Sequence, residues 1–404
     1  MGIQIAHFKP KRNMLKRQRI LSIDVMRGLT LFLMLFVNDL YIPGVPDWLG
    51  HTSASDDGMG LADWVFPGFL FMVGLSIPFA FKAREKKQES KWSLLFHIFS
   101  RTISLLIIGV FMINTSNLNE ELTGMHKTLW VVLGYISVFL IWNKYPKQSK
   151  MAFLKYLGIA LLIYLAFTFR GGTAEKPTFI EKGWWGILGL IGWGYLVAAL
   201  TYFFLRDSVW KTVFACFVFL FLNILNDSGF TNFMNPLKPI FGVILSGSVP
   251  LIVLSGLLIG ILLKEFKNEQ IKFLKRIIPI GLAGIVLAFV LHYWFIFSKI
   301  LATSSWGMLC TGISVLVFGL LYYLIDIKNI TAFFKPFKPA GQNSLTTYLA
   351  PDIVYYLIWA LPFQVLFYKQ DEMQWLAVLG SLVWALAMIG FAALLSKVNI
   401  RLKL

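Results

Sequence analysis

The chain has 404 residues, of which 57% are hydrophobic and 16% aromatic, and its formal net charge is +17. A soluble domain of this length cannot cover so much apolar surface, so the composition excludes an ordinary globular protein. It predicts an all-α, polytopic transmembrane helical bundle.

Apolar runs of nearly the length that crosses a bilayer, about 20 residues each, recur along the chain with short polar breaks between them. We expect twelve spans, at residues 28–42, 62–81, 93–113, 128–143, 151–169, 183–205, 209–225, 240–263, 274–297, 303–325, 342–367 and 374–396. The first is short and the fourth and seventh are marginal, so ten or eleven spans also fit the pattern. The expected organisation is a basic tail with a motif at the span start (1–27), one transmembrane domain (28–396) and a second tail (397–404).

The distribution of Lys and Arg predicts the orientation, because basic residues beside spans stay in the cytoplasm. With the N-terminus inside, the outer segments hold few basic residues: Lys127, Arg170, Lys176, Lys182, Lys238, Lys299 and Lys369. Both termini are therefore expected in the cytoplasm. The loop after the first span, which has no Lys or Arg between residues 40 and 61, is expected outside. The leader through Arg19 has no apolar core, so we expect no cleavable signal.

The positive charge is spread over many segments rather than gathered on one face, which favours membrane topology and anionic lipid over nucleic acid as its explanation. Cys216 and Cys310 both fall inside expected spans. The sequence therefore predicts neither a disulfide framework nor a metal site.

The segment RILSIDVMRG opens the first span with Asp24 and Arg27 three residues apart, a spacing at which they can pair on a helix. One interpretation is structural: Ser22 caps the helix and Arg27 anchors it at the headgroups. The other is that Arg27 points into the bundle and meets an anionic ligand.

Polar residues also gather at the outer end of the first span, where Asn38 and Asp39 precede a polar loop with His51, and Asp63 begins the second span. A neutral imidazole can accept a proton near neutral pH, and a neighbouring carboxylate can hold its tautomer. Outer loops are ordinarily polar, so the alternative is a histidine with no chemical role.

These motifs carry a resemblance to a known family. The R-x-x-S-x-D-x-x-R-G start, Asn38, the His51 loop and GLADWVFPGFLFMVGLSIPF together resemble the heparan-alpha-glucosaminide N-acetyltransferase family. FSKILATSSWGML and GQNSLTTY are similar to that family's late asparagine-lysine and G-x-N-S-x-x-x-Y segments. Residues 114–240 match only in hydropathy. The loop from His51 through Asp63 is longer than in relatives and lacks their tryptophan, which leaves the acceptor open.

The resemblance implies transfer of an acetyl group from cytoplasmic acetyl-CoA to the amine of a glucosamine unit across the membrane, here a bacterial inner membrane. The acceptor would be a glycosaminoglycan fragment, such as heparan sulfate, or cell-envelope glucosamine. His51 would be the general base or would briefly carry the acetyl group. Asn38 would stabilise the oxyanion, and Asp39 or Asp63 would orient the imidazole.

Donor and acceptor need further groups, and polar residues in or beside spans are the candidates. For the CoA phosphates we expect Arg27, Arg101, Asn343, Ser344 and Tyr348. For the acceptor we expect Asp56, Asp57, Lys299 and Asp352. Asn343 and Ser344 present a helix N-terminus suited to phosphate, although helix capping explains them equally well. Asp352 and His292 are expected as a buried polar pair or as pathway lining, and Lys299 as the partner of an outer carboxylate.

The expected partners are acetyl-CoA as co-substrate, an amino-sugar or glycan acceptor and membrane lipids, with no nucleic acid or metal; a homodimer is possible. Two other functions fit parts of the sequence. Twelve spans with both ends inside is also a common layout of secondary transporters, although the polar residues lack the symmetry between halves expected there. A D-x-x-R-G start with a nearby histidine is also shared by membrane O-acyltransferases of the related transmembrane acyltransferase superfamily.

Overall fold

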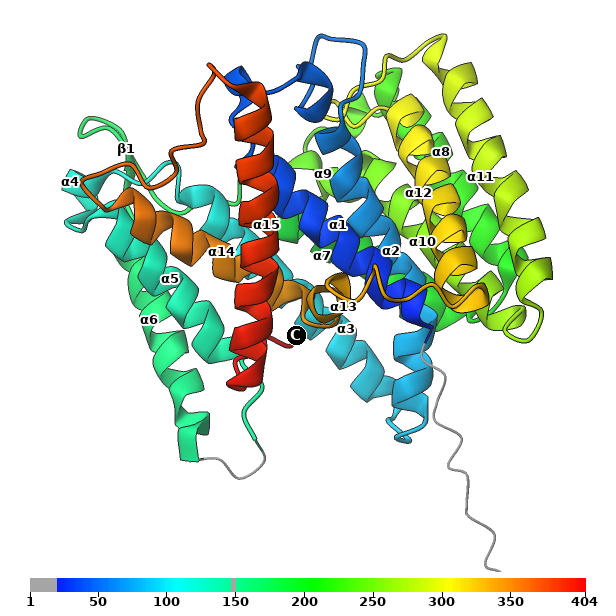
Figure 1. Ribbon diagram of the computed structural model, residues 1–404, viewed down its shortest axis with the longest axis horizontal. Coiled ribbons are helices and arrows are strands. Elements are labelled where there is room, and N and C mark those ends of the chain that lie inside the picture. Colours follow the sequence, from blue (N-terminus) through cyan, green and yellow to red (C-terminus); the bar gives the residue numbers. More distant parts are fainter. Residues whose placement is uncertain (1–19, 147–149) are drawn as a thin grey trace, which may run out of the picture.

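The computed structural model describes residues 20–146 and 150–404, so most of the expected N-terminal tail lies outside the described residues. The described part is almost entirely helical, with two short paired strands (Figure 1). The elements are α1 (Leu21–Asp39), α2 (Leu61–Glu85), α3 (Lys91–Asn114), α4 (Glu120–Thr123), α5 (Lys127–Trp142), α6 (Leu154–Thr168), β1 (Gly171–Gly172), β2 (Pro177–Thr178), α7 (Gly186–Leu205), α8 (Val209–Asp227), α9 (Lys238–Leu245), α10 (Ser248–Glu265), α11 (Gln270–His292), α12 (Ser304–Tyr322), α13 (Phe337–Gln342), α14 (Ser344–Trp359) and α15 (Gln374–Lys397).

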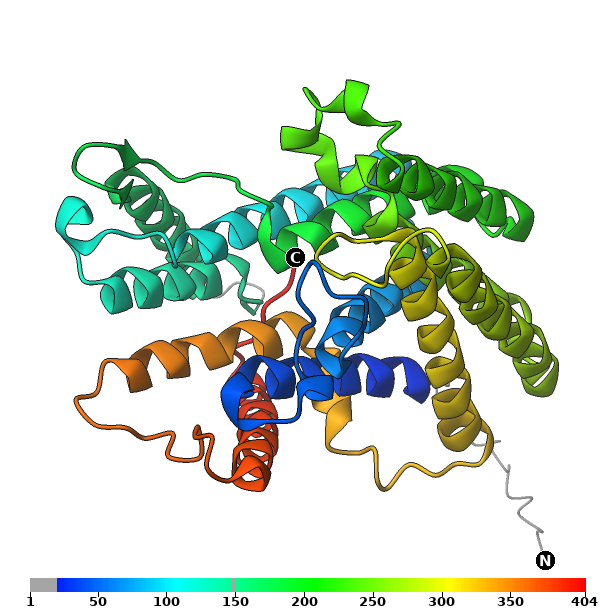
Figure 2. The ribbon, with the colours of Figure 1, turned by 90° about the horizontal axis from the view of Figure 1, so that it is seen from above.

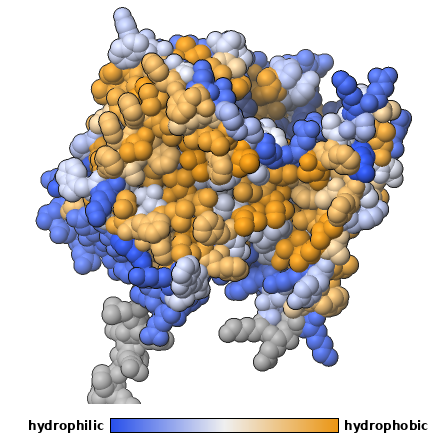
Figure 3. All heavy atoms as spheres, turned by 180° about the vertical axis from the view of Figure 1, so that it is seen from behind, coloured by the Kyte–Doolittle hydropathy of each residue, from blue (hydrophilic) through white to orange (hydrophobic). Residues whose placement is uncertain are grey.

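Ten helices among the described residues are long and apolar enough to cross a membrane. They are α1, α2, α3, α6 with its preceding turn, α7, α8, α10, α11, α12 with its following turn, and α15. The expected spans at 128–143 and 342–367 correspond to α5 and α14, which have only 16 residues each. Figure 3 shows the broad apolar band that these helices present, with polar side chains along its borders. The expectation of a multi-pass helical protein is confirmed.

Two expected spans have the wrong limits. The apolar run 240–263 is divided into α9 and α10, because the chain breaks at Gly247, whose φ of +78° is left-handed and ends the helical path. The run 342–367 is helical only to Trp359, and the residues from Ala360 to Met373 form a loop. Hydropathy continues through both breaks, so it could not reveal them.

The bundle has central and peripheral helices. Seen from above, α1 and α2 lie near the middle of the molecule, and other helices are arranged around them (Figure 2). α1, α2 and α10 are buried over most of their length, whereas α6 and α8 lie at the edge with little of their surface covered. α2 and α10 touch backbone to backbone: a Cβ on Gly74 would lie 1.8 Å from the Val253 carbonyl oxygen. Small residues at such contacts let helices approach closely within a membrane.

The start of α1 is held by a residue distant in sequence. The backbone N–H groups of Leu21 and Ser22 each donate to a different carboxylate oxygen of Asp326, both at 3.0 Å. Asp326 belongs to the helical turn Tyr323–Ile327 after α12. The expectation that Ser22 caps this helix is wrong, because the helix begins one residue earlier and Asp326 provides the capping oxygens. This anchor fixes the direction of α1 and hence the position of Arg27.

The loops of residues 40–60 and 293–303 lie together at one edge of the bundle, at the top of Figure 1. The first turn of α1 and the last residues of the chain lie on the opposite side of them. The candidate functional residues therefore fall into two groups, one beneath these loops and one toward the opposite edge.

Candidate active site

His51 and Asp63 form a hydrogen-bonded pair at the mouth of the loop side. Nδ1 of His51 lies 2.7 Å from Oδ1 of Asp63, which is fully buried, while the imidazole is about half exposed. Because an ionised carboxylate only accepts hydrogen bonds, the pairing assigns the proton to Nδ1 and makes Nε2 the acceptor nitrogen, which Nζ of Lys299 approaches at 3.4 Å. This is the tautomer that a general base requires.

Asp63 owes its position to the start of α2. Its other oxygen, Oδ2, accepts the backbone N–H of Gly60 at 3.0 Å, which caps the helix, and the backbone N–H of Thr52 at 3.1 Å. The Thr52 hydroxyl contacts the same oxygen at 3.0 Å. One carboxylate thus ties the helix start and the His51 loop together, so the imidazole is held from a rigid element.

Lys299 completes this group from a distant part of the chain. Its Nζ lies 3.1 Å from Nδ1 of His51, 3.4 Å from Nε2 and 3.9 Å from Oδ1 of Asp63. The expected ion pair between Lys299 and an outer carboxylate is therefore present. Burial lowers the pKa of Lys299 below its usual value, although the Asp63 charge opposes this shift.

Asp57 anchors the His51 loop to the segment after α11. Its carboxylate lies 2.7 Å from Nε2 of His292 and accepts the backbone N–H of Phe297 at 2.9 Å. The hydrogen bond from Phe297 and the contact with His292 lower the pKa of Asp57. The neighbouring Asp56 is exposed, and its carboxylate accepts a hydrogen bond from the hydroxyl of Ser55 at 3.5 Å.

The two deeper candidates do not pair with each other. His292 contacts Asp57, and Asp352 instead accepts a hydrogen bond from the hydroxyl of Tyr135 on α5. Asp352 is on α14 and shares no hydrogen bond with His51 or Lys299 among the described residues. The packing of α5 against α14 brings Tyr135 to Asp352. These residues are 217 positions apart along the chain, so the sequence could not indicate their contact.

Asn38 and Asp39 have different surroundings although they are adjacent. Asn38 is exposed, and its amide makes no hydrogen bond to any residue that the structure describes. Asp39 is buried and is bonded by the hydroxyls of Tyr355 and Tyr368 and by Nζ of Lys369. Asp39 is therefore committed to these three groups, and Asp63 is the carboxylate that orients His51.

Packing of α1 against α2 places Asn38 level with the start of α2. A Cβ on Gly68 would lie 3.3 Å from the Thr30 methyl group, so the two helices meet at these positions. The two helices run in opposite directions. Asn38 is eight residues after Thr30 and Gly60 is eight residues before Gly68, so Asn38 and Gly60 lie at a similar level. Asn38 thus lies at the depth of the His51–Asp63 pair.

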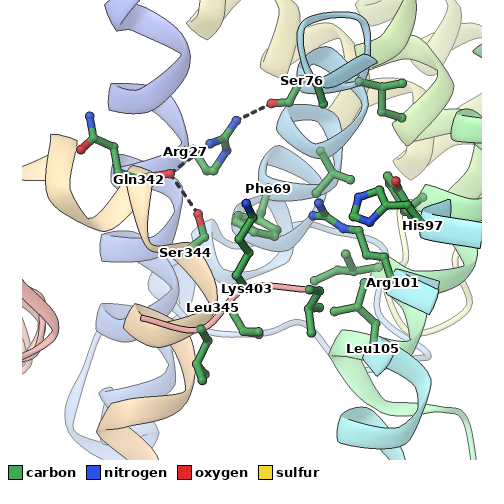
Figure 4. Close-up of a pocket in the computed structure, with 18 of the residues that line it drawn as sticks. Arg27, Phe69, Ser76, His97, Arg101, Leu105, Gln342, Ser344, Leu345 and Lys403 are labelled. Atoms are coloured by element: carbon green, nitrogen blue, oxygen red, sulfur yellow. Dashed lines mark hydrogen bonds between the residues drawn. The ribbon is translucent and has the colours of Figure 1, made fainter. Parts of the chain in front are cut away.

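A cavity of about 440 Å³ enters the bundle on the side remote from His51. It is lined by α1, α2, α3, α7, the α13–α14 junction and the last residues of the chain (Figure 4). Its cationic lining groups are Arg27, Arg84, Lys87, Arg101 and Lys403, and the imidazole of His97 also lines it. No Asp or Glu is found among its described lining residues. Such an unbalanced set of cations favours an anionic ligand.

The inner wall of the cavity is built around Arg27. Its guanidinium donates to the carbonyl oxygen of Gly341 at 3.0 Å and to the hydroxyl of Ser76, and lies 3.9 Å from the Asp24 carboxylate (Figure 4). A Cβ on Gly341 would lie 1.8 Å from the Asp24 carbonyl oxygen, so only glycine permits α13 to approach α1 this closely. Ser344 donates to the same Gly341 oxygen at 3.1 Å.

Four of the five expected donor-binding residues line this cavity: Arg27, Arg101, Ser344 and Tyr348. Asn343 does not, because its amide turns back to the Pro339 carbonyl oxygen at 3.4 Å. Arg101 lies with its guanidinium 4.6 Å from the centre of the Tyr195 ring, and its buried Nε has no hydrogen-bond partner among the described residues. A buried donor without a partner is costly unless a ligand satisfies it.

Sequence reasoning missed Arg84, Lys87, His97 and Lys403 as cavity residues. Arg84, Lys87 and Lys403 are among the basic residues outside the expected outer segments, which the charge distribution assigns to the cytoplasmic side. Their positions beside span ends were the available signal, but the distribution of charge along the sequence does not show which side chains line the same cavity. Among the described residues, no group of three or more His, Cys, Asp and Glu side chains has the arrangement of a metal site.

Comparison with known proteins agrees with the motifs. Residues 19–222 match the family described as a domain of unknown function, DUF5009. The chain belongs to this family. It is also 26% identical over 390 residues to heparan-alpha-glucosaminide N-acetyltransferase of Mus musculus, covering 86% of this chain and 56% of that protein. The Homo sapiens protein of the same name is 38% identical over 96 residues, which cover 24% of this chain and 14% of the relative. The resemblance inferred from the motifs is thus confirmed.

The chain spans little more than half the length of the mouse relative. The DUF5009 match extends from the start of α1 into α8 and contains His51, Asp63 and Arg101. Lys299 and the α13–α14 junction lie beyond it. The group around His51 and the lining of the basic cavity therefore each include residues from outside the DUF5009 match.

Proposed function

We propose that this protein transfers the acetyl group of acetyl-CoA to the amine of a glucosamine-type sugar on the other side of a membrane. The observation that carries the proposal is the His51–Asp63 pair at one edge of the bundle, with the basic cavity entering from the opposite direction along the same helix. A base and an anion-binding cavity are the two parts that this reaction needs.

The cavity suits the donor. Its α2 lining extends from Phe69 to Arg84, 15 positions later and roughly 22 Å along the helix, and Lys87 lines it from just beyond the end of α2. The basic end suits the CoA phosphates, and the apolar end, which includes Met34, Phe69 and Leu105, suits the pantetheine arm. Asp63 lies six residues beyond Phe69, roughly 9 Å along the helix, so the thioester at the end of the arm would approach His51.

The loop side suits the acceptor. An ammonium group must lose a proton before it attacks a thioester, and Nε2 of His51 would accept that proton. The amine nitrogen forms the new C–N bond and the C–S bond breaks. CoA leaves as the thiol with the proton that His51 received, and the second proton that the nitrogen loses on forming the amide passes to solvent. The Asn38 amide would donate to the oxyanion of the tetrahedral intermediate. Transient acetylation of His51, followed by attack of the amine, is the second route that the same groups permit.

Four residues are proposed to bind the acceptor or to support its binding site. The exposed Asp56 would bind ammonium or hydroxyl groups of the acceptor. Lys299 would pair with Asp63 and also contact hydroxyl groups of the acceptor at the rim of the site. Asp57 would act through its anchor to His292, which shapes the loop. Asp352, which accepts a hydrogen bond from Tyr135 and does not line the basic cavity, would support the bundle around the site rather than contact the sugar.

We propose that the His51 loop faces the periplasm and that both termini face the cytoplasm of a bacterial inner membrane. The basis is the concentration of Lys and Arg on the opposite side, including Arg84 and Lys87 at the end of α2. α5 and α14 would complete twelve spans, giving an even number.

The test uses purified protein with radiolabelled acetyl-CoA and a panel of amino sugars and sugar alcohols. Label on glucosamine nitrogen is the expected result. Label only on hydroxyl groups would replace the proposal by O-acyl transfer to an envelope glycan. No acetyl transfer, together with uptake of a labelled solute into proteoliposomes, would replace it by transport.

A further inference from the structure

The end of the chain folds back into the basic cavity. After α15 ends at Lys397, the backbone reverses at Asn399, whose φ of +64° is left-handed, and residues 399–404 run inward. We call residues 399–404 the strap. Leu402, Lys403 and Leu404 of the strap line the cavity.

The strap is held by a set of backbone hydrogen bonds. The N–H of Lys144 donates to the Arg401 carbonyl oxygen at 2.9 Å, and the N–H of Lys403 donates to the Trp142 carbonyl oxygen at 2.8 Å. Asn143 and Leu402 thereby form an antiparallel bridge. The N–H of Leu402 also donates to the Thr346 hydroxyl at 2.9 Å. The strap is thus tied to the end of α5 and to α14, and its backbone fixes where Lys403 projects.

Lys403 enters a group of cations that has few counter-charges. Its side chain faces the cavity that Arg84 and Lys87 also line (Figure 4). Glu89 is the acidic group beside them, and it already pairs with Arg84 at 2.6 Å. Burial and the charges of Lys144, Lys87 and Arg84 lower the pKa of Lys403. Like charges held this close repel unless an anion lies between them.

The geometry points to Lys403 as a further donor-binding residue, which contacts a phosphate of the nucleotide end of CoA together with Lys87 and Arg84. This inference rests on the proposed function for the identity of the donor. The strap places one cation on the wall opposite α2, so an anion at the cavity mouth is contacted from two sides. The apolar arm then lies deeper, toward Phe69.

The experiment compares full-length wild type with Lys403→Gln in two measurements. The first is binding of adenosine 3′,5′-bisphosphate, which carries nucleotide phosphates and no thioester. The second is acetyl transfer from S-acetyl-N-acetylcysteamine, a thioester without phosphates. Loss of one charge-assisted hydrogen bond predicts bisphosphate binding weakened about 10-fold or more and an unchanged rate with the short thioester. Lys403→Arg should retain most of the affinity, which separates charge from folding.

Lys397→Gln is the matched control, because Lys397 is an exposed lysine at the end of α15 and does not line the cavity. Equal bisphosphate affinity of wild type and Lys403→Gln would overturn the inference. An equal loss in both measurements would also overturn it, because the strap would then have only a structural role. A wild type that binds the bisphosphate through Lys403 but transfers no acetyl group would overturn the proposed function and leave the inference standing.

Discussion

The Asp63 carboxylate lies 2.7 Å from Nδ1 of the His51 imidazole and fixes its tautomer from inside the bundle. Asp63 is buried at the start of α2, whereas the imidazole reaches the surface. The imidazole is thereby attached to the helix along which the basic cavity extends.

His51→Ala should lower acetyl transfer by about 100- to 10,000-fold and leave the affinity for acetyl-CoA unchanged, because loss of a general base acts on rate rather than on donor binding. Steady-state kinetics and calorimetry of the same preparation measure the two effects. His126→Ala is the control, since His126 is exposed in the loop before α5. Near wild-type transfer by folded His51→Ala would exclude His51 as the base.

Asn38→Ala should lower kcat by about 100- to 1,000-fold with little change in KM, because an oxyanion donor acts only as charge develops. The substitution removes no hydrogen bond within the described residues, so the melting temperature should stay within a few degrees of wild type. Asn268→Ala provides an exposed asparagine in the α10–α11 loop for comparison. A rise in KM at constant kcat would instead assign Asn38 to acceptor binding.

Arg101→Gln should weaken acetyl-CoA binding by roughly 10- to 150-fold, since Arg101 lines the cavity and its buried Nε has no hydrogen-bond partner among the described residues. The affinity for the amino sugar should not change. Arg276→Gln removes an exposed arginine on α11 and should have no effect on either ligand. Unchanged donor affinity in folded Arg101→Gln would place the CoA phosphates elsewhere.

Asp57→Asn should change the dependence of stability on pH. The hydrogen bond from Phe297 and the contact with His292 lower the pKa of Asp57 from its usual 3.8, so its stabilising effect is full above about pH 3.8. The effect is lost as pH falls through the folded pKa. Thermal melting between pH 6 and pH 3 should therefore show a steeper acid-side decline for wild type than for Asp57→Asn. Asp56→Asn should follow the wild-type curve; identical curves for all three proteins would refute the anchoring role.

The orientation predicts opposite labelling of His51→Cys and Lys87→Cys by a membrane-impermeant maleimide in intact cells. Only the cysteine at position 51 should react from outside. The native Cys216 and Cys310 lie in α8 and α12 and are replaced by alanine to remove background. Reaction of both new cysteines from one side would contradict the topology and, with it, transfer across the membrane.

The sequence predicted what depends on local pattern. Apolar runs indicated the helices, and the sequence offered Asp39 and Asp63 as alternative partners of His51, of which the structure shows Asp63 in contact with it. The sequence could not place the partners of Asp39, because Tyr368 is 329 positions away along the chain and Lys369 follows it in a loop. Nor could it gather Arg84 and Lys403 around one cavity, since that depends on how the strap packs against helices distant in sequence.

The two short helices have a consequence for the host membrane. α5 and α14 have 16 residues each, about 24 Å of helix, whereas the hydrocarbon core of a typical bilayer is about 30 Å thick. Lipids that surround a helix shorter than the core must compress, or the polar helix ends enter hydrocarbon. α14 also forms part of the cavity wall, so with α5 and α14 as the two spans that complete the proposed twelve the compressed lipid would lie beside the cavity. In that arrangement thicker bilayers would oppose the native packing on this side of the protein, and thinner ones would relieve the mismatch.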